Sequence, residues 1–429
     1  MRVRKKAFGA IAAGLAGLLA LGACGGGQGT NAGGSEANGK VKLEWTLWAA
    51  GADEQAQWKH IADLVTKEHP DITVELRTGP FADYFTKLKT QLAGGQAPCL
   101  VTMQSLRLPT FASALEPLDS AIPDFKPADW DKGSLEAMKS DGKQLGLPYG
   151  FATMLMYYNR DAFDKAGVPL PKPGWTTADF EAAAKKLTTP GKPGFGLSFS
   201  DLHMFSMLQA YNGARPVDDS GKVQLTTPEM KDAFTWYSGL ATKQKVANVP
   251  ASSSDVPWGE QQFVAGNAAM AVDGTWNLGS NTKAAKFRLG VAPLPAGPAG
   301  LTSYVADSGF AISKACKYKD AAAKALAVMT GPEAQTYLAG QGRSYPARTA
   351  VVDTYKTFLS SQVGAKNPDL AAAAISSLQA SFTKTTPFIA SGNWDQVTKK
   401  IAQNFLPAYT GATPPDQALQ TVQQQSQGS

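Results

Sequence analysis

The sequence contains few of the residues that build metal and redox sites. Its 429 residues include three cysteines and three histidines. His60, His69 and His203 are far apart in the chain and show no metal-ligand spacing such as His-x-x-x-His. We therefore expect no metal and no cofactor, and we place His60 and His69 on solvated helix faces.

Motifs of several enzyme and nucleotide-binding classes are also missing. No Gly-x-Ser-x-Gly sequence is present, which argues against a nucleophile elbow. The glycine-rich stretch 191–196 contains a proline and predicts a turn rather than a phosphate loop. The stretch 218–221 resembles a hairpin turn and lacks the closing glutamate of a Ca²⁺ loop. Nothing in these patterns points to catalysis.

The excess of positive charge is small and belongs mostly to one end of the chain. The formal net charge is +6, and the first 23 residues hold four basic residues and no acidic one. Removing them leaves a net charge of +2. No basic stripe is interleaved with aromatic residues, so we expect no nucleic-acid partner.

An uncharged apolar run at 7–21 follows the basic cluster at 2–6. It has the length of a signal-peptide core and is short for a bilayer span, which needs roughly 20 residues. The next residues, LGAC (21–24), resemble the bacterial lipobox, whose cysteine is diacylglyceryl-modified. We predict a lipoprotein signal peptide at 1–23 and lipidation of Cys24. An ordinary secretory signal with a chance cysteine and a transmembrane anchor are the alternatives.

The segment 24–40 is rich in Gly, Asn, Ser and Gln and has almost no apolar bulk to bury. A glycine-rich coil of this length spans roughly 20–25 Å. We expect a flexible tether that holds a folded body outside the cytoplasm, at the outer face of the cell membrane.

The body that follows is large and holds two further cysteines. Roughly 400 residues exceed the size at which one core normally suffices, so we expect two lobes. With Cys24 used by the lipid, Cys99 and Cys316 remain as an even pair in an oxidising compartment. We predict a disulfide between them, and two buried free thiols are the alternative.

Hydrophobic periodicity predicts alternating strands and helices. The first unit has a strand at 41–48, a helix at 53–67, a strand at 72–76, a helix at 84–92 and a strand at 99–103. Further strands are expected at 154–158, 195–199, 268–273 and 287–292, with helices that begin at Thr176 and Thr227. After about residue 320 the pattern is mostly helical. This order predicts two α/β units with crossover helices, followed by a helical tail.

Five motifs occur along the chain in a fixed order: WTLW (45–48), LAGGQAP (92–98), DGKQLGLPY (141–149), MYYNRDAFDKAG (156–167), and FVAGNAAM with DGTW (263–276). Together they resemble the family 1 extracellular solute-binding proteins, the maltose-binding-protein-like group of bacterial ABC sugar importers. One position departs from the family pattern. Cys99 stands where the family usually has an aspartate after the proline, which strengthens the expectation that Cys99 has a partner.

The resemblance implies an α/β fold of the two-lobed periplasmic-binding-protein type (type II), with a mostly parallel sheet flanked by helices in each lobe. The implied lobes are 40–149 plus 292–330 for lobe one and 150–291 plus 331–429 for lobe two. The chain would cross between these discontinuous lobes near Tyr149-Gly150 and Ala292-Pro293, where a short hinge absorbs the dihedral change.

A carbohydrate site needs flat aromatic surfaces and a few convergent polar groups. Ligands of open α/β sheets lie beyond the carboxyl ends of the strands, so we select residues there. In lobe one they are Trp48, Gln104, and Asp53 or Glu54. The alternatives are core packing for Trp48, helix capping by Ser105 beside Gln104, and an N-cap role for Asp53.

Trp276 is the strongest single candidate, because it follows a glycine turn where the family often presents an aromatic residue to the cleft. Further candidates near turns and crossings are Phe151, Tyr211 with Asn212, Trp258, Asp307 with Ser308, Arg343 and Tyr345. Arg343 is suited to paired hydroxyls or a carboxylate, and its alternative is an ion pair on a lobe surface.

We therefore predict a monomeric, lipid-anchored receptor, not an enzyme, that binds a carbohydrate in the interlobe cleft and delivers it to the permease subunits of an ABC importer. Disaccharides, longer oligosaccharides and amino sugars all fit, and a peptide or anionic solute would fit if Arg343 faced the cleft. The alternatives are a secreted glycan hydrolase, which needs two carboxylates flanking the scissile bond, and a lectin-like adhesin.

Overall fold

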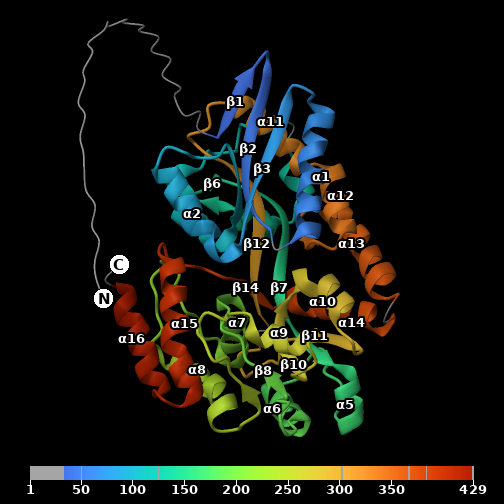
Figure 1. The fold of residues 1–429 in the computed structure, drawn as a ribbon, viewed down its shortest axis with the longest axis vertical. Coiled ribbons are helices and arrows are strands. Elements are labelled where there is room, and N and C mark those ends of the chain that lie inside the picture. The colour runs from blue at the N-terminus through green and yellow to red at the C-terminus, as the bar shows by residue number, and fades with distance from the viewer. Residues whose placement is uncertain are drawn as a thin grey trace, which may run out of the picture. The chain divides into compact units, whose positions relative to one another are not determined.

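One twelve-stranded sheet carries both halves of the body (Figure 1). The computed structural model describes residues 33–427 except 50, 124, 301–302, 366–367 and 383. The predicted signal peptide and Cys24 therefore lie outside the described residues. The main path of the sheet is, in spatial order, β1 (Gly34–Ala37), β2 (Lys40–Trp48), β4 (Leu100–Gln104), β12 (Ser303–Ile312), β7 (Leu147–Asn159), β10 (Met270–Gly274), β8 (Phe195–Gly196) and β9 (Ala247–Asn248).

Four strands pair beside this path: β3 (Ile72–Gly79) with β2, β11 (Leu289–Pro293) and β13 (Tyr345–Pro346) with β7, and β14 (Thr385–Pro387) with β12. The strands β5 (Lys139–Ser140) and β6 (Lys143–Gln144) form a separate hairpin. Pairing is parallel from β2 to β3 and β4, and from β8 to β9 and β10. The pairs that β7 makes with its neighbours are antiparallel.

The first α/β unit has the predicted order of elements. Helices α1 (Ala52–Glu68) and α2 (Phe81–Ala93) connect the parallel strands β2, β3 and β4. Helix α1 buries Trp58, Ile61, Ala62 and Val65, the apolar face expected from the sequence. Its N-cap is Gly51, so Asp53 lies in the first turn and does not cap the helix.

The second unit is built from α5 (Arg160–Ala166), α6 (Thr177–Leu187), α7 (Asp201–Asn212), α8 (Pro228–Thr242), α9 (Trp258–Val264) and α10 (Leu278–Ala284). The predicted caps are present: Thr176 forms a capping box with Asp179 at α6, and Thr227 accepts a backbone hydrogen bond at α8. The strand expected at 195–199 is shorter than predicted, because only Phe195–Gly196 pair as β8.

The helical tail expected after residue 320 is also present. It comprises α11 (Lys319–Met329), α12 (Pro332–Gly340), α13 (Val352–Phe358), α14 (Pro368–Phe382), α15 (Trp394–Thr410) and α16 (Pro415–Gln427). Two short helices, α3 (Leu108–Phe111) and α4 (Lys132–Ala137), complete the first half. No helix within the described ranges combines the length and apolar character needed to cross a membrane.

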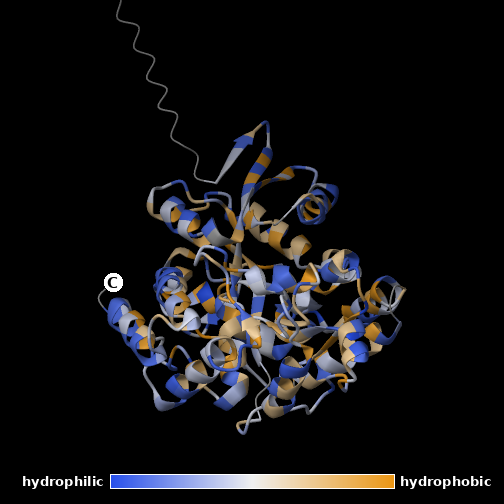
Figure 2. Ribbon diagram, turned by 60° about the horizontal axis from the view of Figure 1, so that its bottom comes forward, coloured by the Kyte–Doolittle hydropathy of each residue, from blue (hydrophilic) through white to orange (hydrophobic). Residues whose placement is uncertain are grey.

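Each half has its own hydrophobic core. The first core includes Trp45, Trp58 and Phe310, and the second includes Phe205 and Trp394. In Figure 2, hydrophobic and hydrophilic residues alternate along the outer helices, as expected for helices that bury one face. Cys99 and Cys316 are both buried in the first core, where they form a disulfide that links positions 217 residues apart.

Strands β7 and β12 run from one core into the other. β12 contributes Tyr304 and Ala306 to the second core and Phe310 and Ile312 to the first. β7 pairs with β12 through residues 147–153 and with β10 and β11 through residues 154–159. The sheet is therefore continuous, and two passages of the chain between the cores run inside these paired strands. A further passage lies between Ala347 of the first core and Phe388 of the second.

Gly150 lies at this passage and needs to be glycine. A methyl group on its Cα would lie 1.9 Å from Ser344 Oγ and 2.7 Å from the Tyr345 carbonyl oxygen. The absence of a side chain lets β13 approach β7 where the strand leaves the first core.

Candidate functional site

Trp48 and Gln104 lie at the same edge of the sheet, because they end the parallel strands β2 and β4. Trp48 packs against the rings of Phe81, Tyr84 and Phe85, with centroid distances of 5.2–5.8 Å, and is 9% exposed. Phe81 is 42% exposed, the largest opening to solvent of any large hydrophobic side chain in the described ranges. At this edge it is Phe81, rather than Trp48, that offers an open aromatic ring.

Arg107 extends from this edge of the first core to the second core. It donates from Nη1 to Gln104 Oε1 at 2.6 Å and from Nε to Asp395 Oδ1 at 2.9 Å, and its Nη2 lies 3.9 Å from Asp201 Oδ2. Its guanidinium lies 4.7 Å from the Phe85 ring centroid. Asp201 and Asp395 belong to α7 and α15, which pack in the second core. This ion pair therefore joins the two halves.

Sequence reasoning missed Arg107 because a single arginine between two leucines forms no motif. The available signal was its position, three residues after Gln104 at a predicted strand end. A second link between the halves lies beside it, where Thr110 Oγ1 donates to the Gly392 carbonyl at 3.2 Å.

Phe151, Asp307 and Tyr345 lie together on one face of the crossing strands. Phe151 is directly opposite Asp307 in β12 and opposite Tyr345 in β13, so the three side chains point to the same side. The Phe151 ring lies 5.1 Å from Tyr345 and 4.8 Å from Phe382, measured between centroids. The structure thus brings these three predicted residues into one cluster at the passage between the cores.

Asp307 is 3% exposed, and its Oδ1 has no hydrogen-bond partner among the described residues. Burial raises the pKa of this carboxyl to about 7; a hydrogen bond from Ser134 opposes the rise, and the charge of Asp131 adds to it. The Asp307 backbone N–H donates to Ser105 Oγ at 2.9 Å. A neutral, buried carboxyl therefore lies between the cores at mildly acidic pH.

Arg343 forms a largely buried ion pair. Its Nη1 lies 2.8 Å from Glu54 Oε1, and its guanidinium lies 5.7 Å from the Trp58 ring centroid. The side chains of Arg343 and Glu54 are 17% and 11% exposed. Glu54 is therefore the acidic residue of α1 that turns inward, whereas Asp53 is exposed. The positive charge of Arg343 is therefore matched by an ion pair, although this pair is largely buried rather than on a lobe surface.

Trp276 and Trp258 are both half-buried at the ends of the second unit's elements. Trp276 follows β10 in a 3-10 turn and lies 5.9 Å from the His203 ring, edge to face. Trp258 begins α9. Tyr211 lies apart from these residues, stacked on Trp236 at 4.4 Å between centroids.

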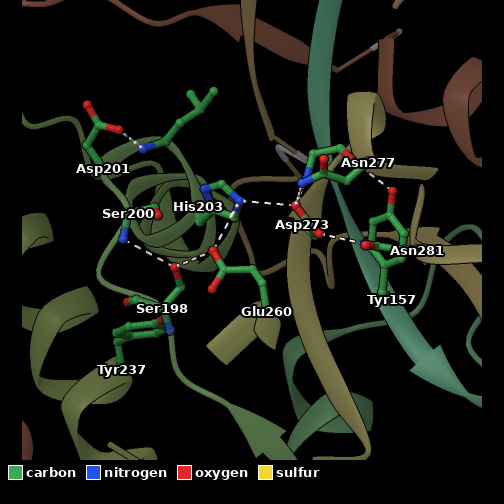
Figure 3. Close-up of polar contacts among 12 residues, drawn as sticks. Tyr157, Ser198, Ser200, Asp201, His203, Tyr237, Glu260, Asp273, Asn277 and Asn281 are labelled. Atoms are coloured by element: carbon green, nitrogen blue, oxygen red, sulfur yellow. Dashed lines mark hydrogen bonds and ion pairs between the residues drawn. The ribbon is translucent and has the colours of Figure 1, made fainter. Parts of the chain in front are cut away.

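His203, in α7, is the centre of a buried polar cluster that sequence reasoning did not find (Figure 3). Its Nε2 lies 3.2 Å from Glu260 Oε1 and 3.4 Å from Asp273 Oδ1. All three residues are at most 8% exposed. Glu260 is in α9 and Asp273 in β10, so the cluster joins three elements of the second core.

Fixed donors hold both carboxylates of this cluster. Asp273 Oδ1 accepts from the Gly274 backbone N–H at 2.7 Å and from Asn277 Nδ2 at 2.9 Å, and its Oδ2 accepts from Asn281 Nδ2 at 2.7 Å. Glu260 Oε1 accepts from Ser198 Oγ at 2.9 Å. Both carboxylate oxygens of Asp273 therefore have hydrogen-bond donors.

The pKa of His203 follows from opposing effects. Burial would lower it, but attraction by Glu260 and Asp273, with a smaller part from Asp201, outweighs burial and raises it. Burial raises the pKa of Glu260, and the neighbouring His203 opposes that rise. His203 and Glu260 therefore influence each other's protonation, because the charge of each opposes the effect of burial on the other.

A hollow of about 690 Å³ adjoins this cluster. Glu260, Asp273, Asn277 and Asn281 line it, together with residues of α9 and α10 and Phe287. A smaller hollow of about 410 Å³ lies nearby around Lys286, Arg288 and Asp161. Both hollows belong to the second half, and residues of the first core line neither.

The arrangement is suited to holding a polar ligand. Charged and amide groups from both cores converge at Arg107, whose guanidinium lies 5.4 Å from the centroid of the exposed Phe81 ring. No group of three or more metal-ligating side chains suited to an ion occurs in the part of the chain that the structure describes.

Comparison with known proteins places the chain among binding proteins. The family described as bacterial extracellular solute-binding protein matches residues 48–336. A binding protein of Brucella abortus is 27% identical over 274 residues, which cover 61% of this chain and 64% of that protein. The maltodextrin-binding protein of Bacillus subtilis is 26% identical over 64% of this chain and 66% of its own length. The chain thus spans less than two thirds of these relatives.

Solved structures match over more of the chain. An ABC substrate-binding protein of Listeria monocytogenes in complex with cycloalternan has a TM-score of 0.78 at 27% identity, over 90% of this chain and 97% of that one. The GacH receptor of Streptomyces glaucescens, solved unliganded and with acarbose, has a TM-score of 0.74 at 25% identity, over the same shares. The mixed α/β architecture with flanking helices is therefore that of the type II periplasmic binding proteins.

Proposed function

The chain belongs to the bacterial extracellular solute-binding proteins, and we propose that it is the receptor of an ABC importer and binds a carbohydrate between its two cores. The observation that carries this proposal is the convergence at Arg107. Polar groups of the first half and carboxylates of the second half meet there, at the carboxyl ends of parallel strands.

The two cores are proposed to be two lobes that open and close around the ligand. Strands β7 and β12 serve as the hinge, with their crossings near Gly150 and Asp307. Ala292 and Leu294 are buried in the second core and Ala334 and Leu338 of α12 in the first, so we propose that 292–294 move with the second lobe and α12 with the first. A ligand that contacts both lobes only when they are together shifts the population toward the closed state.

A neutral or hydroxyl-rich solute suits the site better than an anion. The cation that would have recognised an anionic ligand, Arg343, is paired with Glu54, and Arg107 is paired with Asp395. The named ligands of the similar proteins, cycloalternan, acarbose and maltodextrin, are carbohydrates or carbohydrate-like. These features support an oligosaccharide as the transported solute and transmembrane permease subunits as the partner.

The proposal includes a lipid anchor on Cys24, which holds the receptor at the outer face of the membrane. The signal sequence and the LGAC motif support it. A lipoprotein of Streptomyces antibioticus is 26% identical over 71% of this chain, which adds support from a similar protein.

The test is a thermal-shift screen of the mature chain against a library of neutral, amino and acidic sugars. A solute at 100 times its dissociation constant adds about 2.7 kcal/mol to the free energy of unfolding. We expect at least one oligosaccharide to raise the melting temperature and Trp276→Ala to abolish the rise. The control Trp236→Ala should retain it, since Trp236 stacks on Tyr211 and donates to Glu181, neither of which is among the groups that converge at Arg107. Cleavage of the saccharide would instead identify a hydrolase, and a library without any binder would reject the proposal.

A further inference from the structure

The cluster of His203, Glu260 and Asp273 places three ionisable side chains in a buried position. A buried charge without a partner is strongly destabilising, so buried ionisable groups need a counter-charge. Here two carboxylates face one imidazole nitrogen, at 3.2 and 3.4 Å. A protonated His203 supplies a counter-charge to these carboxylates, and a neutral His203 does not.

The cluster supports the proposed binding surface directly. Asp273 accepts from Asn277, which follows Trp276 in the same turn, and the Trp276 ring packs against the His203 ring. A methyl group on Gly274 would lie 2.4 Å from the Trp276 ring, so the ring is also held against the backbone beside Asp273. Trp276 is therefore in contact with His203 and is linked to Asp273 through the hydrogen bond of Asn277.

One edge of the His203 imidazole is uncommitted. Nε2 faces the two carboxylates, whereas Nδ1 is buried and has no hydrogen-bond partner among the described residues. Figure 3 shows this second nitrogen turned away from Glu260 and Asp273. Since Nε2 lies between two carboxylate oxygens, it carries a proton in either charge state, and the proton that titrates is the one on Nδ1.

The other titratable groups around the cluster come from each element packed against it. Asp201 lies on the same helix as His203 and is itself 3.9 Å from Arg107. Tyr237 of α8 exchanges hydrogen bonds with the backbone of Ser198, and Tyr157 of β7 donates to the Gly274 carbonyl at 2.8 Å. Both tyrosines are buried, and burial raises their pKa values, so they are neutral throughout the physiological range.

We propose that Glu260 and Asp273 are positioning residues of the binding site: they hold His203 as an imidazolium beside Trp276, so that ligand affinity depends on the protonation of His203. This inference rests on the proposed carbohydrate site. Loss of the proton leaves Glu260 and Asp273 facing each other without a cation between them, and the Trp276 turn that rests on them shifts. Affinity is therefore present below the pKa of His203 and falls as the pH rises through it.

The direct test measures the protonation of His203 without any ligand. The chain has three histidines, so ring-labelled protein without a histidine tag gives three signals in a pH titration by NMR. His203→Gln identifies the signal of His203, and His60 and His69 serve as internal controls. We expect His203 to titrate above both controls, and Glu260→Gln to move its midpoint down by at least one pH unit.

A matched variant separates charge from folding. Glu181→Gln changes a carboxylate of the same half that accepts from Trp236 Nε1, away from His203, and should leave the His203 midpoint unchanged. The affinity of the best saccharide from the screen should fall at least tenfold between pH 6 and pH 9 in the parent chain and in Glu181→Gln. In Glu260→Gln the fall should occur at a correspondingly lower pH.

The outcomes are distinct from those of the proposed function. If His203 titrates at or below His60, or if Glu260→Gln leaves its midpoint in place, the inference is overturned even when saccharides bind. If saccharides bind with an affinity that does not change over pH 6–9, it is also overturned. If no saccharide binds, the proposed function fails, and so does the proposed dependence of ligand affinity on the protonation of His203. The NMR midpoint of His203 then decides only whether the imidazolium forms. Should Glu260→Gln not fold, the midpoint in the parent chain decides that point.

Discussion

Replacing Asp307 with asparagine should change the stability of the protein in a way that depends strongly on pH. Asp307 is a buried carboxyl on β12, only 3% exposed, and one of its oxygens has no partner among the described residues. Asparagine has the same shape and does not ionise. The substitution therefore removes the titration of this carboxyl while leaving the packing of β12 in place.

The magnitude follows from the pKa, which burial raises from 3.8 to about 7. A raised carboxyl pKa stabilises the fold fully below the unfolded value, and that contribution is lost as the pH rises through the folded value. The total difference spans about three pH units at about 1.4 kcal/mol each, or roughly 4 kcal/mol. Of this, about 3 kcal/mol lies between pH 5 and pH 8.

The assay is denaturant unfolding of the parent chain and of Asp307→Asn at pH 5 and pH 8, monitored by tryptophan fluorescence. We expect the variant to gain about 3 kcal/mol relative to the parent on going from pH 5 to pH 8. The unpaired amide of asparagine costs about 1–3 kcal/mol at both pH values and cancels in this difference. The control Asp353→Asn alters a carboxylate that is 90% exposed and should show no such gain. If the difference in the free energy of unfolding between variant and parent is the same at pH 5 and pH 8, the reasoning is refuted.

Three further perturbations follow from the same structure. Replacing Cys99 and Cys316 together with serine should lower the free energy of unfolding by up to ~5 kcal/mol, because the disulfide closes a loop of 217 residues; thermal unfolding with and without reductant checks this. A double-mutant cycle of Arg107→Gln and Asp395→Asn should give a coupling energy of about 1 kcal/mol, because the partial exposure of Asp395 weakens the ion pair. A coupling energy of zero would show that this pair does not join the halves. Changing Cys24 to serine should release the protein from the membrane fraction, and intact-mass measurement should show the loss of the lipid.

Much of the fold was predictable because the local signals agree with one another. The apolar–polar alternation at 41–48 predicted β2, and the apolar helical face of Trp58, Ile61 and Val65 predicted α1. The N-caps Thr176 and Thr227 predicted the starts of α6 and α8. The resemblance implied a crossing near Tyr149-Gly150, but the sequence did not show that β7 and β12 cross as paired strands. A buried strand that serves two cores has the same apolar composition as one that serves a single core. The same ambiguity affected β8, whose buried continuation pairs with no neighbour.

The candidate site was only partly predictable, because local sequence does not tell which way a side chain turns. Asp53 and Glu54 are neighbours in α1, yet only Glu54 faces inward, because one step along the helix changes the direction of the side chain. His203 showed no metal spacing and was left without a role, although Glu260 and Asp273 reach it from elements 57 and 70 positions away in the chain. A contact of this kind is set by the tertiary fold and has no signature in the sequence near His203.

The most direct test of the account is small-angle X-ray scattering of the mature chain, first stripped of bound solute and then saturated with the best oligosaccharide from the screen. If two lobes close around the ligand on the hinge of β7 and β12, the radius of gyration falls on saturation, and it stays at the ligand-free value in Trp276→Ala at the same saccharide concentration. Scattering curves of the parent chain that superimpose with and without saturating saccharide would contradict the account.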